Sequence, residues 1–225
     1  MSVPASEQGH SLFPTVIFDF DGTLADTLGV AVEIVNGLAP NFGYKKIIPQ
    51  DIPRLRTLTM RELLKEFDIS MLVLPRIVKT VHKELNMRMQ EVRPFPEMIE
   101  VWGSLRQMGV TLGVGTSNTK RNVLAFFSHH KFAECDFIVS SSGIFGKGRI
   151  LKGILRERGI APTDALYVGD EVRDIEAARD AGMRIVSVTW GYNAREALAA
   201  CRPDYLIDHP RELVAVIDSI LTQKG

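Results

Sequence analysis

From Glu97 onward the chain alternates between amphipathic stretches and short apolar runs, and this order restricts the fold more than any other feature. Strands that alternate with helices predict a doubly wound parallel α/β sheet with helices on both faces. The predicted strands are Val110–Val114, Phe137–Val139, Ala165–Val168, Arg184–Val188 and Tyr205–Ile207. In such a sheet ligands bind at the carboxyl ends of the strands, so functional side chains are expected there.

The apolar run Val16–Phe18 predicts a further buried strand, which ends at Asp19, Asp21 and Gly22. Residues two apart on an extended chain point the same way, so the carboxylates of Asp19 and Asp21 are expected to face a common centre. Such a pair repels unless a cation or a shared proton lies between the two groups. An Asp-Gly hairpin with solvated acids is the alternative, and the helical pattern after Gly22 disfavours it.

A block of helix, Leu28–Val92, interrupts the α/β pattern, because nothing in it has the bounded, β-branched form of a strand. Asp26 is expected to cap its first helix, which Pro40 and Gly43 are expected to end. Two further helices are predicted to begin at the capping box Thr59–Glu62 and near Pro75. The sequence thus predicts a helical insert in a parallel sheet.

Composition and charge restrict what the chain binds. Its 225 residues carry 27 acidic and 27 basic side chains, so no global field favours nucleic acid or an anionic membrane. Cys135 and Cys201 lack CxxC spacing, which predicts reduced thiols and a cytoplasmic protein. Residues 1–11 have neither the basic start nor the apolar run of a signal peptide and are expected to form a flexible tail.

Polar residues also follow a later strand, as a site at the carboxyl ends requires. Thr116, Ser117 and Asn118 come after the strand Val110–Val114. Hydroxyls and free N–H groups ahead of a helix suit an anion. The same three residues are also an ordinary helix N-cap cluster, and taken alone this second interpretation is favoured.

Lys147 stands between Gly146 and Gly148, ahead of a helix predicted from Ile150. A fixed ammonium group can neutralise a phosphoryl group and hold an aspartate ionised. A flexible surface loop is the alternative interpretation of this segment. Lys152, one turn into the helix, is the rival candidate for the same role.

Asp170, Glu171 and Asp174 follow the strand Ala165–Val168. Acidic residues at a strand end and a helix start can hold Mg²⁺, which prefers oxygen ligands. Helix capping by Asp170 or Asp174 is the alternative. Capping leaves unexplained why these carboxylates would join the pair that follows the first strand.

Taken in order, these groups resemble the four motifs of the haloacid dehalogenase superfamily of phosphohydrolases. The matching residues are Asp19-Phe20-Asp21-Gly22-Thr23 for the first motif, Thr116 for the second, Lys147 for the third, and Gly169-Asp170 with Asp174 for the fourth. The resemblance implies a Rossmann-like core, residues 12–27 and 94–225, with an inserted helical cap, residues 28–93. This arrangement is similar to that of phosphoglycolate phosphatase-like members of the superfamily.

The resemblance also implies a role for each residue. Asp19 is expected to be the nucleophile and Asp21 the general acid/base. Mg²⁺ is expected to bind Asp19, Asp170 and the backbone carbonyl of Asp21, with Asp174 in a supporting role. The residues expected to bind the phosphoryl group are Gly22, Thr116, Ser117, Asn118 and Lys147, of which Thr116 and Lys147 are also counted as catalytic.

The implied activity is that of a magnesium-dependent phosphatase acting through an aspartyl-phosphate. Its expected substrate is a small phosphorylated metabolite, phosphoglycolate-like or a sugar phosphate, and the chain is expected to be a monomer or a homodimer. A phosphomutase of the same superfamily, which would need a bisphosphate activator, is one alternative. A catalytically silent protein that binds a phosphate ligand on the same fold is another.

Two further segments are candidates for contact with substrate. Arg56 and its neighbour Arg54 precede the capping box on the expected cap, where Arg56 is predicted to meet a substrate carboxylate or second phosphate. Most arginines at such positions are simply solvated. Trp190–Asn193 is expected either to line the opening of the site or to form a turn with packed aromatic rings.

Overall fold

The computed structural model describes residues 15–140 and 146–222 of the chain. The predicted N-terminal tail, residues 1–11, and residues 12–14 of the predicted core lie outside this part. Among the described residues no helix combines the length and apolar character that crossing a membrane requires.

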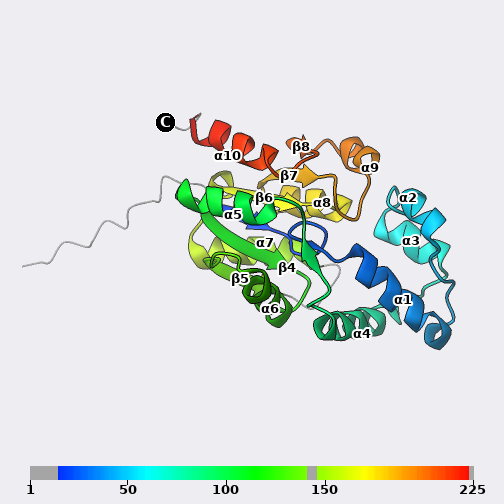
Figure 1. Cartoon of the computed structure of the whole chain (residues 1–225). Helices are drawn as coiled ribbons and strands as arrows, with labels where there is room; N and C mark the ends of the chain where they lie inside the picture. Colours follow the sequence, from blue (N-terminus) through cyan, green and yellow to red (C-terminus); the bar gives the residue numbers. More distant parts are fainter. Residues whose placement is uncertain (1–14, 141–145, 223–225) are drawn as a thin grey trace, which may run out of the picture.

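A six-stranded sheet forms the centre of the molecule, with the strand order β5-β4-β1-β6-β7-β8 (Figure 1). Every neighbouring pair in it is parallel. The strands are β1 (Thr15–Phe18), β4 (Thr111–Thr116), β5 (Phe137–Ser140), β6 (Ala165–Gly169), β7 (Arg184–Val188) and β8 (Tyr205–Ile207). Because β1 lies between β4 and β6, the residues that follow these three strands meet at one edge.

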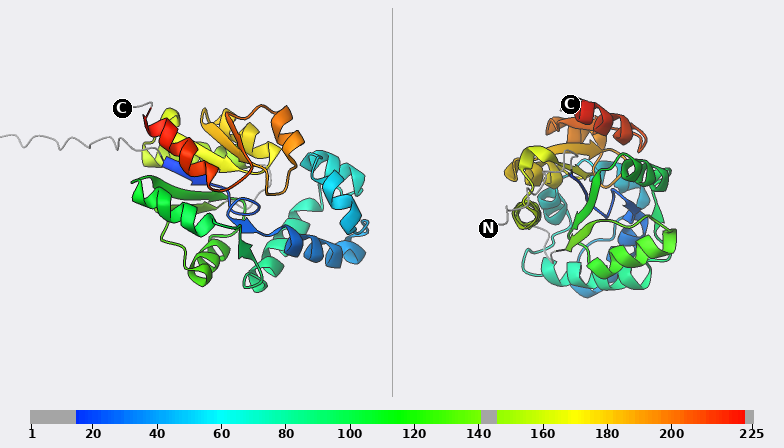
Figure 2. Two further views of the ribbon diagram at one scale, coloured as in Figure 1. Left: turned by 45° about the horizontal axis from the view of Figure 1, so that its top comes forward. Right: turned by 90° about the vertical axis from the view of Figure 1, so that its left-hand side faces the viewer.

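Helices cover both faces of the sheet, which confirms the predicted fold class (Figure 2). Val16 and Phe18 of β1 belong to one apolar cluster, and Ile17 belongs to the other, as alternation along a strand requires. The first cluster contains side chains of α5 (Met98–Gln107), α6 (Lys120–His130) and α10 (Glu212–Thr222). The second contains side chains of α7 (Lys147–Arg158), α8 (Val172–Asp180) and α9 (Arg195–Ala200).

The helical insert lies between β1 and β4 in the sequence and beyond the carboxyl ends of the strands in space (Figure 1). It comprises α1 (Leu28–Phe42), the 3₁₀ turn η1 (Pro49–Asp51), α2 (Ile52–Leu55), α3 (Met60–Glu66) and α4 (Leu74–Met87). The insert has its own apolar cluster, which includes Leu55, Phe67 and Ile77. Leu85 on α4 belongs instead to the first apolar cluster of the core, which also contains side chains of α6. The insert therefore packs against the core through α4.

An antiparallel pair of short strands, β2 (Ala25–Asp26) and β3 (Arg93–Pro94), marks the two points where the chain passes between core and insert. Asp26 lies in β2 and is not the cap of α1, whose N-cap residue is Thr27. The prediction for Asp26 is therefore wrong, because Asp26 pairs with Arg93 in the two short strands before the helix begins.

Two predicted helix boundaries also change. Pro40 lies inside α1, which continues until Gly43 takes a left-handed conformation with φ of 75°. Pro40 is only three residues from that end, so the backbone hydrogen bond it removes affects only the last turn. Helix α7 begins at Lys147 rather than near Ile150. The capping box of Thr59 and Glu62 at the start of α3 is confirmed.

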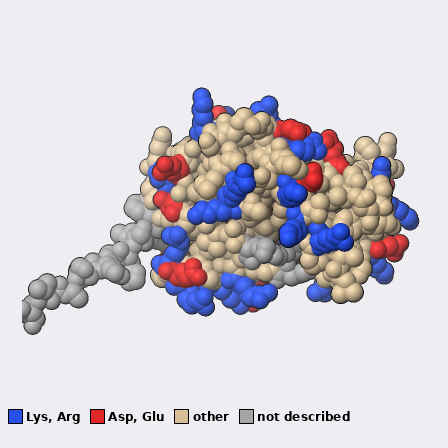
Figure 3. Space-filling view, turned by 90° about the horizontal axis from the view of Figure 1, so that it is seen from below, with Lys and Arg blue, Asp and Glu red and all other residues tan. Residues whose placement is uncertain are grey.

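The surface carries charges of both signs. On the face shown in Figure 3, basic side chains occur over the core and the insert, and acidic side chains lie among them. This mixture accords with the equal numbers of acidic and basic residues in the sequence.

A glycine in β4 provides a test of how tightly the sheet packs. A Cβ atom at Gly113 would lie 2.1 Å from the ring of the buried Phe137, so we expect Gly113→Ala to lower the free energy of unfolding by about 1–3 kcal/mol. Gly103 in α5 has nothing within 4 Å of the same position, and Gly103→Ala should raise stability by about 0.5–1 kcal/mol. Urea denaturation of both variants measures the difference, and equal effects would contradict the packing described here.

Candidate active site

Three acidic side chains meet where β1 and β6 end. Asp19 directly follows β1, Asp170 directly follows β6, and Asp174 lies in the first turn of α8. All three are buried. One carboxylate oxygen from each lies within 4.8 Å of the others, which forms a group that can hold a metal ion. The structure therefore brings the carboxylates of Asp19, Asp170 and Asp174 together, whereas the expected pairing of the Asp19 and Asp21 carboxylates at one centre is not seen in this group.

Lys147 lies within this acidic group. Its Nζ donates a hydrogen bond to Oδ2 of Asp19 at 2.5 Å and another to Oδ1 of Asp174, and its side chain is only 4% exposed. Lys152 lies on the surface instead, where its Nζ is 2.8 Å from Oδ1 of Asp180. Of the two candidate lysines, the structure therefore brings Lys147 to the carboxylates. The segment before it, residues 141–145, lies outside the described residues.

Burial and neighbouring charges shift the pKa of Asp19, Asp170 and Lys147. It raises the pKa of Asp19 to about 7, although the ammonium group of Lys147 acts in the opposite direction. Burial, and after it the carboxylate of Glu171, raises the pKa of Asp170 well above its ordinary value. Burial alone would lower the pKa of Lys147, but Asp174 and Asp19 raise it above the ordinary lysine value, so Lys147 is an ammonium ion. A bound cation would favour the ionised forms of Asp19 and Asp170.

The surroundings of Asp170 fix its carboxylate in place. Its Oδ1 accepts a hydrogen bond from Oγ1 of Thr23 at 2.7 Å, and its Oδ2 accepts one from the backbone N–H of Tyr192 at 2.7 Å. A Cβ atom at Gly22 or at Gly191 would lie 2.1 or 2.2 Å from Oδ2, so both positions need glycine. Fixed carboxylate oxygens suit a hard divalent cation. The donor set therefore fits a metal ion.

Asp174 has a different environment from Asp19 and Asp170. Its Oδ2 accepts the backbone N–H groups of Asp170 and Glu171 at 3.0 Å each, while its Oδ1 faces Lys147. These contacts orient the turn and the lysine, in keeping with the supporting role that the sequence suggests. The side chain of Asp21 is not part of the acidic group found among the described residues. The expected metal ligand from Asp21 is its backbone carbonyl oxygen, not its side chain.

Asp21 is held by a residue from the end of β4. Nδ2 of Asn118 donates to both carboxylate oxygens of Asp21, at 3.0 and 2.9 Å. Burial raises the pKa of Asp21, and the hydrogen bond from Asn118 opposes that increase. Thr116 is buried, and its Oγ1 accepts the backbone N–H of Asn118 at 2.9 Å. Ser117 lies beside them and is half-buried. The structure thus gathers the predicted residues of motifs one and two.

The guanidinium group of Arg56 contacts the core rather than the acidic group. It donates hydrogen bonds to the backbone carbonyls of Thr189, Gly191 and Tyr192, at 3.0, 2.7 and 3.3 Å. The backbone carbonyl of Arg56 in turn accepts the N–H of Ala194 at 2.7 Å. These bonds tie the insert to the loop that also holds Asp170. The neighbouring Arg54 pairs with Glu66 on the surface.

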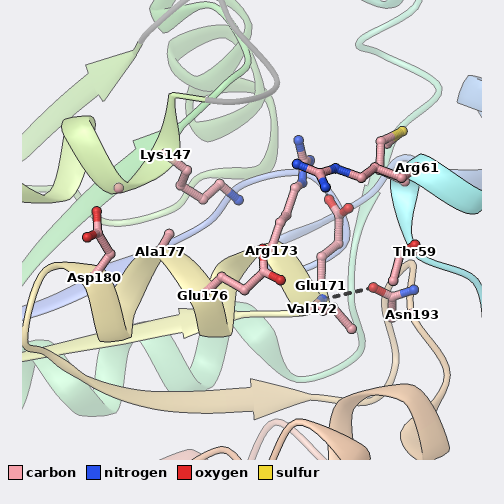
Figure 4. Close-up of a pocket in the computed structure, with 12 residues that line it drawn as sticks. Thr59, Arg61, Lys147, Glu171, Val172, Arg173, Glu176, Ala177, Asp180 and Asn193 are labelled. Atoms are coloured by element: carbon pink, nitrogen blue, oxygen red, sulfur yellow. Dashed lines mark hydrogen bonds and ion pairs between the residues drawn. The ribbon is translucent and has the colours of Figure 1, made fainter.

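A cleft of about 510 Å³ lies between the insert and α8 (Figure 4). Lys147 lies at one end of it, and Arg61 enters from α3 and extends toward Glu171 and Arg173. Among the described residues, neither Asp19 nor Arg56 lines the cleft. Arg61 is therefore a candidate that the sequence reasoning missed. Its place inside the capping box Thr59–Glu62, in the first turn of α3, is the signal that could have found it.

The segment Trp190–Asn193 combines both predicted roles. Trp190 packs against Phe95 and donates from its ring nitrogen to the carbonyl of Thr23 at 3.1 Å. Asn193 lines the cleft and donates to the carbonyl of Leu58 at 3.1 Å. The segment is thus a packed aromatic turn that also bridges to the insert.

The chain matches a known protein family over most of its length. A family model described as haloacid dehalogenase-like hydrolase matches residues 16–188. The chain belongs to this family. The resemblance drawn from the four sequence motifs is thereby confirmed.

Relatives of this hydrolase carry phosphatase names. It is 34% identical over 209 residues to the phosphoglycolate phosphatase of Synechococcus elongatus, covering 92% of this chain and 99% of the relative. It is 29% identical over 219 residues to the N-acetylmuramic acid 6-phosphate phosphatase of Pseudomonas aeruginosa, covering 92% and 95%. A crystal structure of a predicted phosphatase from Clostridium acetobutylicum matches the fold with a TM-score of 0.79 at 22% identity, covering 93% and 100%.

The two lysines of α7 allow a direct comparison in this hydrolase. In metal-free buffer at neutral pH, we expect Lys147→Met to lower the free energy of unfolding by about 3–5 kcal/mol, because Asp19 and Asp174 lose their buried counter-charge. Lys152→Met removes a pair that is half exposed and should cost less than about 1 kcal/mol. Chemical denaturation with EDTA present measures both values. Similar losses would argue against a buried ion cluster around Lys147.

Proposed function

We propose that this hydrolase is a phosphatase that cleaves a small phosphate ester, with phosphoglycolate as the first candidate substrate. The observation that carries the proposal is the Asp19 carboxylate, which is buried at the end of β1 beside the Lys147 ammonium and the Asp170 carboxylate. An anionic nucleophile beside fixed positive charge is what attack on a phosphoryl group requires. The 34% identity to a phosphoglycolate phosphatase supports the substrate class.

In the proposed reaction, Asp19 attacks the phosphorus atom and forms an aspartyl-phosphate as the bond from phosphorus to the substrate oxygen breaks. Asp21 donates a proton to that departing oxygen. Asp21 then takes a proton from the water molecule that attacks the phosphorus, the bond from phosphorus to Asp19 breaks, and inorganic phosphate leaves as the Asp19 carboxylate is restored. Two easier steps replace one slow hydrolysis.

The remaining residues of the site bind and orient the phosphoryl group. We assign its oxygens to the hydroxyl groups of Thr116 and Ser117 and to the Lys147 ammonium, whereas the backbone N–H of Gly22 already donates to the carbonyl of Ala25 at 2.9 Å. Asn118 holds Asp21 in place through its side-chain amide. Mg²⁺ bound to Asp19, Asp170 and the Asp21 carbonyl would offset the repulsion between the anionic nucleophile and the anionic substrate.

The helical insert, residues 28–93, serves as a cap that decides which esters enter. Arg61 extends a guanidinium group, which pairs well with carboxylates, into the cleft beneath the insert, whereas Arg173 in the same cleft already pairs with Glu171. A substrate with a carboxylate near its phosphate fits this arrangement. We assign the recognition of that carboxylate to Arg61, because Arg56 is bonded to the carbonyls of the core loop.

Phosphate release from a panel of small esters tests the function. We expect release with Mg²⁺, none with EDTA, and a loss of at least about a thousandfold in Asp19→Asn, because the amide cannot act as the nucleophile. Turnover by Asp19→Asn at a near-normal rate would contradict the covalent mechanism. If no ester is hydrolysed until a bisphosphate is added, the chain is a mutase and the proposal fails.

Arg61 and Arg54 provide a matched pair for the substrate assignment. We expect Arg61→Ala to raise KM for phosphoglycolate about tenfold with a smaller change in kcat, because a charged hydrogen bond to the substrate is lost. Arg54→Ala should change neither constant, since Arg54 pairs with Glu66 on the surface. Steady-state kinetics measures both, and an unchanged KM in Arg61→Ala would remove Arg61 from the substrate site.

A further inference from the structure

Three asparagine side chains connect the helical insert to Asp21. Asn86 on α4 donates from Nδ2 to Oδ1 of Asn122 on α6 at 2.5 Å. Nδ2 of Asn122 donates to Oδ1 of Asn118 at 2.7 Å. Nδ2 of Asn118 donates to both carboxylate oxygens of Asp21. An unbroken row of amides therefore runs from the insert to the proposed general acid/base.

Groups with a fixed hydrogen-bonding role determine the direction of this row. The backbone N–H of Thr119 only donates, and it donates to Oδ1 of Asn118 at 2.7 Å, so Asn118 turns its Nδ2 toward the carboxyl oxygens of Asp21, which accept. The backbone carbonyl of His82, also on α4, accepts from Nδ2 of Asn122 at 3.4 Å. Each amide consequently has a single orientation that satisfies its neighbours.

Burial makes that orientation costly to change. Asn118 and Asn122 are 1% and 0% exposed, so water cannot replace a missing partner, and Asn86 is half-buried. If Asn86 no longer donates, Oδ1 of Asn122 loses the partner that the structure gives it. Rotation of the Asn122 amide would then set its oxygen against the oxygen of Asn118.

We propose that Asn86 and Asn122 are positioning residues that hold the Asp21 carboxylate through Asn118. This inference rests on the proposed function, in which Asp21 protonates the leaving oxygen. Because Asn86 belongs to the insert, proton donation by Asp21 depends on the insert lying where the structure has it. The row of amides thus connects the cap to proton donation by Asp21, and Asn86 and Asn122 do not contact the substrate.

The leaving group of the ester separates this role from a merely structural one. An alkoxide leaves poorly and needs the proton of Asp21, whereas p-nitrophenolate leaves without one. The constant kcat/KM reports the steps up to departure of that group and excludes the later attack by water. A defect in Asp21 positioning should therefore lower kcat/KM for alkyl esters far more than for p-nitrophenyl phosphate.

The experiment measures kcat/KM for the best alkyl ester of the panel and for p-nitrophenyl phosphate in four proteins. These are the wild type, Asn86→Ala, Asn86→Asp, and Met87→Ala as the control on the exposed side of the same helix. Asn86→Asp keeps the shape of the side chain but places an acceptor against Oδ1 of Asn122. It therefore tests the direction of the row even if Asn86→Ala folds poorly.

We expect both Asn86 variants to lose about tenfold on the alkyl ester and less than about twofold on p-nitrophenyl phosphate, while Met87→Ala matches the wild type. Equal losses on the two esters, or no loss, would overturn the positioning role while the phosphatase function stands. A wild type that hydrolyses neither ester overturns the proposed function and this inference together.

Discussion

The Lys147 ammonium, held between the carboxylates of Asp19 and Asp174, is the interaction on which the site depends. Burial raises the pKa of Asp19 and Asp170, and repulsion from the neighbouring carboxylates adds to that increase. A single fixed positive charge on α7 opposes both effects for Asp19. Asp174 orients the lysine and the backbone after β6, although its own negative charge raises the pKa of Asp19. Lys147 thus favours the ionised form of the proposed nucleophile, Asp19, at a buried position.

The fold supplies this arrangement through the order of its strands. β1 lies between β4 and β6, so Asp19, Thr116 and Asp170 emerge from neighbouring strands at one edge of the sheet. The loop after β7 then closes around Asp170 through the backbone of Tyr192 and through Gly191, where a side chain would collide with the carboxylate. Arg56 extends the same loop's contacts to the insert. The surroundings of Asp170 and the contact with the insert consequently share a single segment of backbone.

The sequence was informative wherever local pattern decides structure. The apolar run Val16–Phe18 and its later counterparts predict the strands, and parallel pairing places Asp19 and Asp170 at the same edge of the sheet. The strand order that makes β1 and β6 neighbours comes from the structure. Helix α9 was missed because Arg195–Ala200 buries a single side chain, Leu198, and has no apolar period. The orientation of Arg56 and the place of Arg61 depend on how the insert packs on the core. No periodicity within either segment encodes that contact.

The claim that Asp19 accepts the phosphoryl group is tested most directly by trapping the acylphosphate. The protein is quenched during turnover of its best ester with Mg²⁺, reduced with borohydride and digested for peptide mass spectrometry. We predict that residue 19 is reduced to homoserine in the wild type and that no homoserine forms in Asp19→Asn. Rapid phosphate release with residue 19 unmodified, or with reduction at another carboxylate, would contradict it.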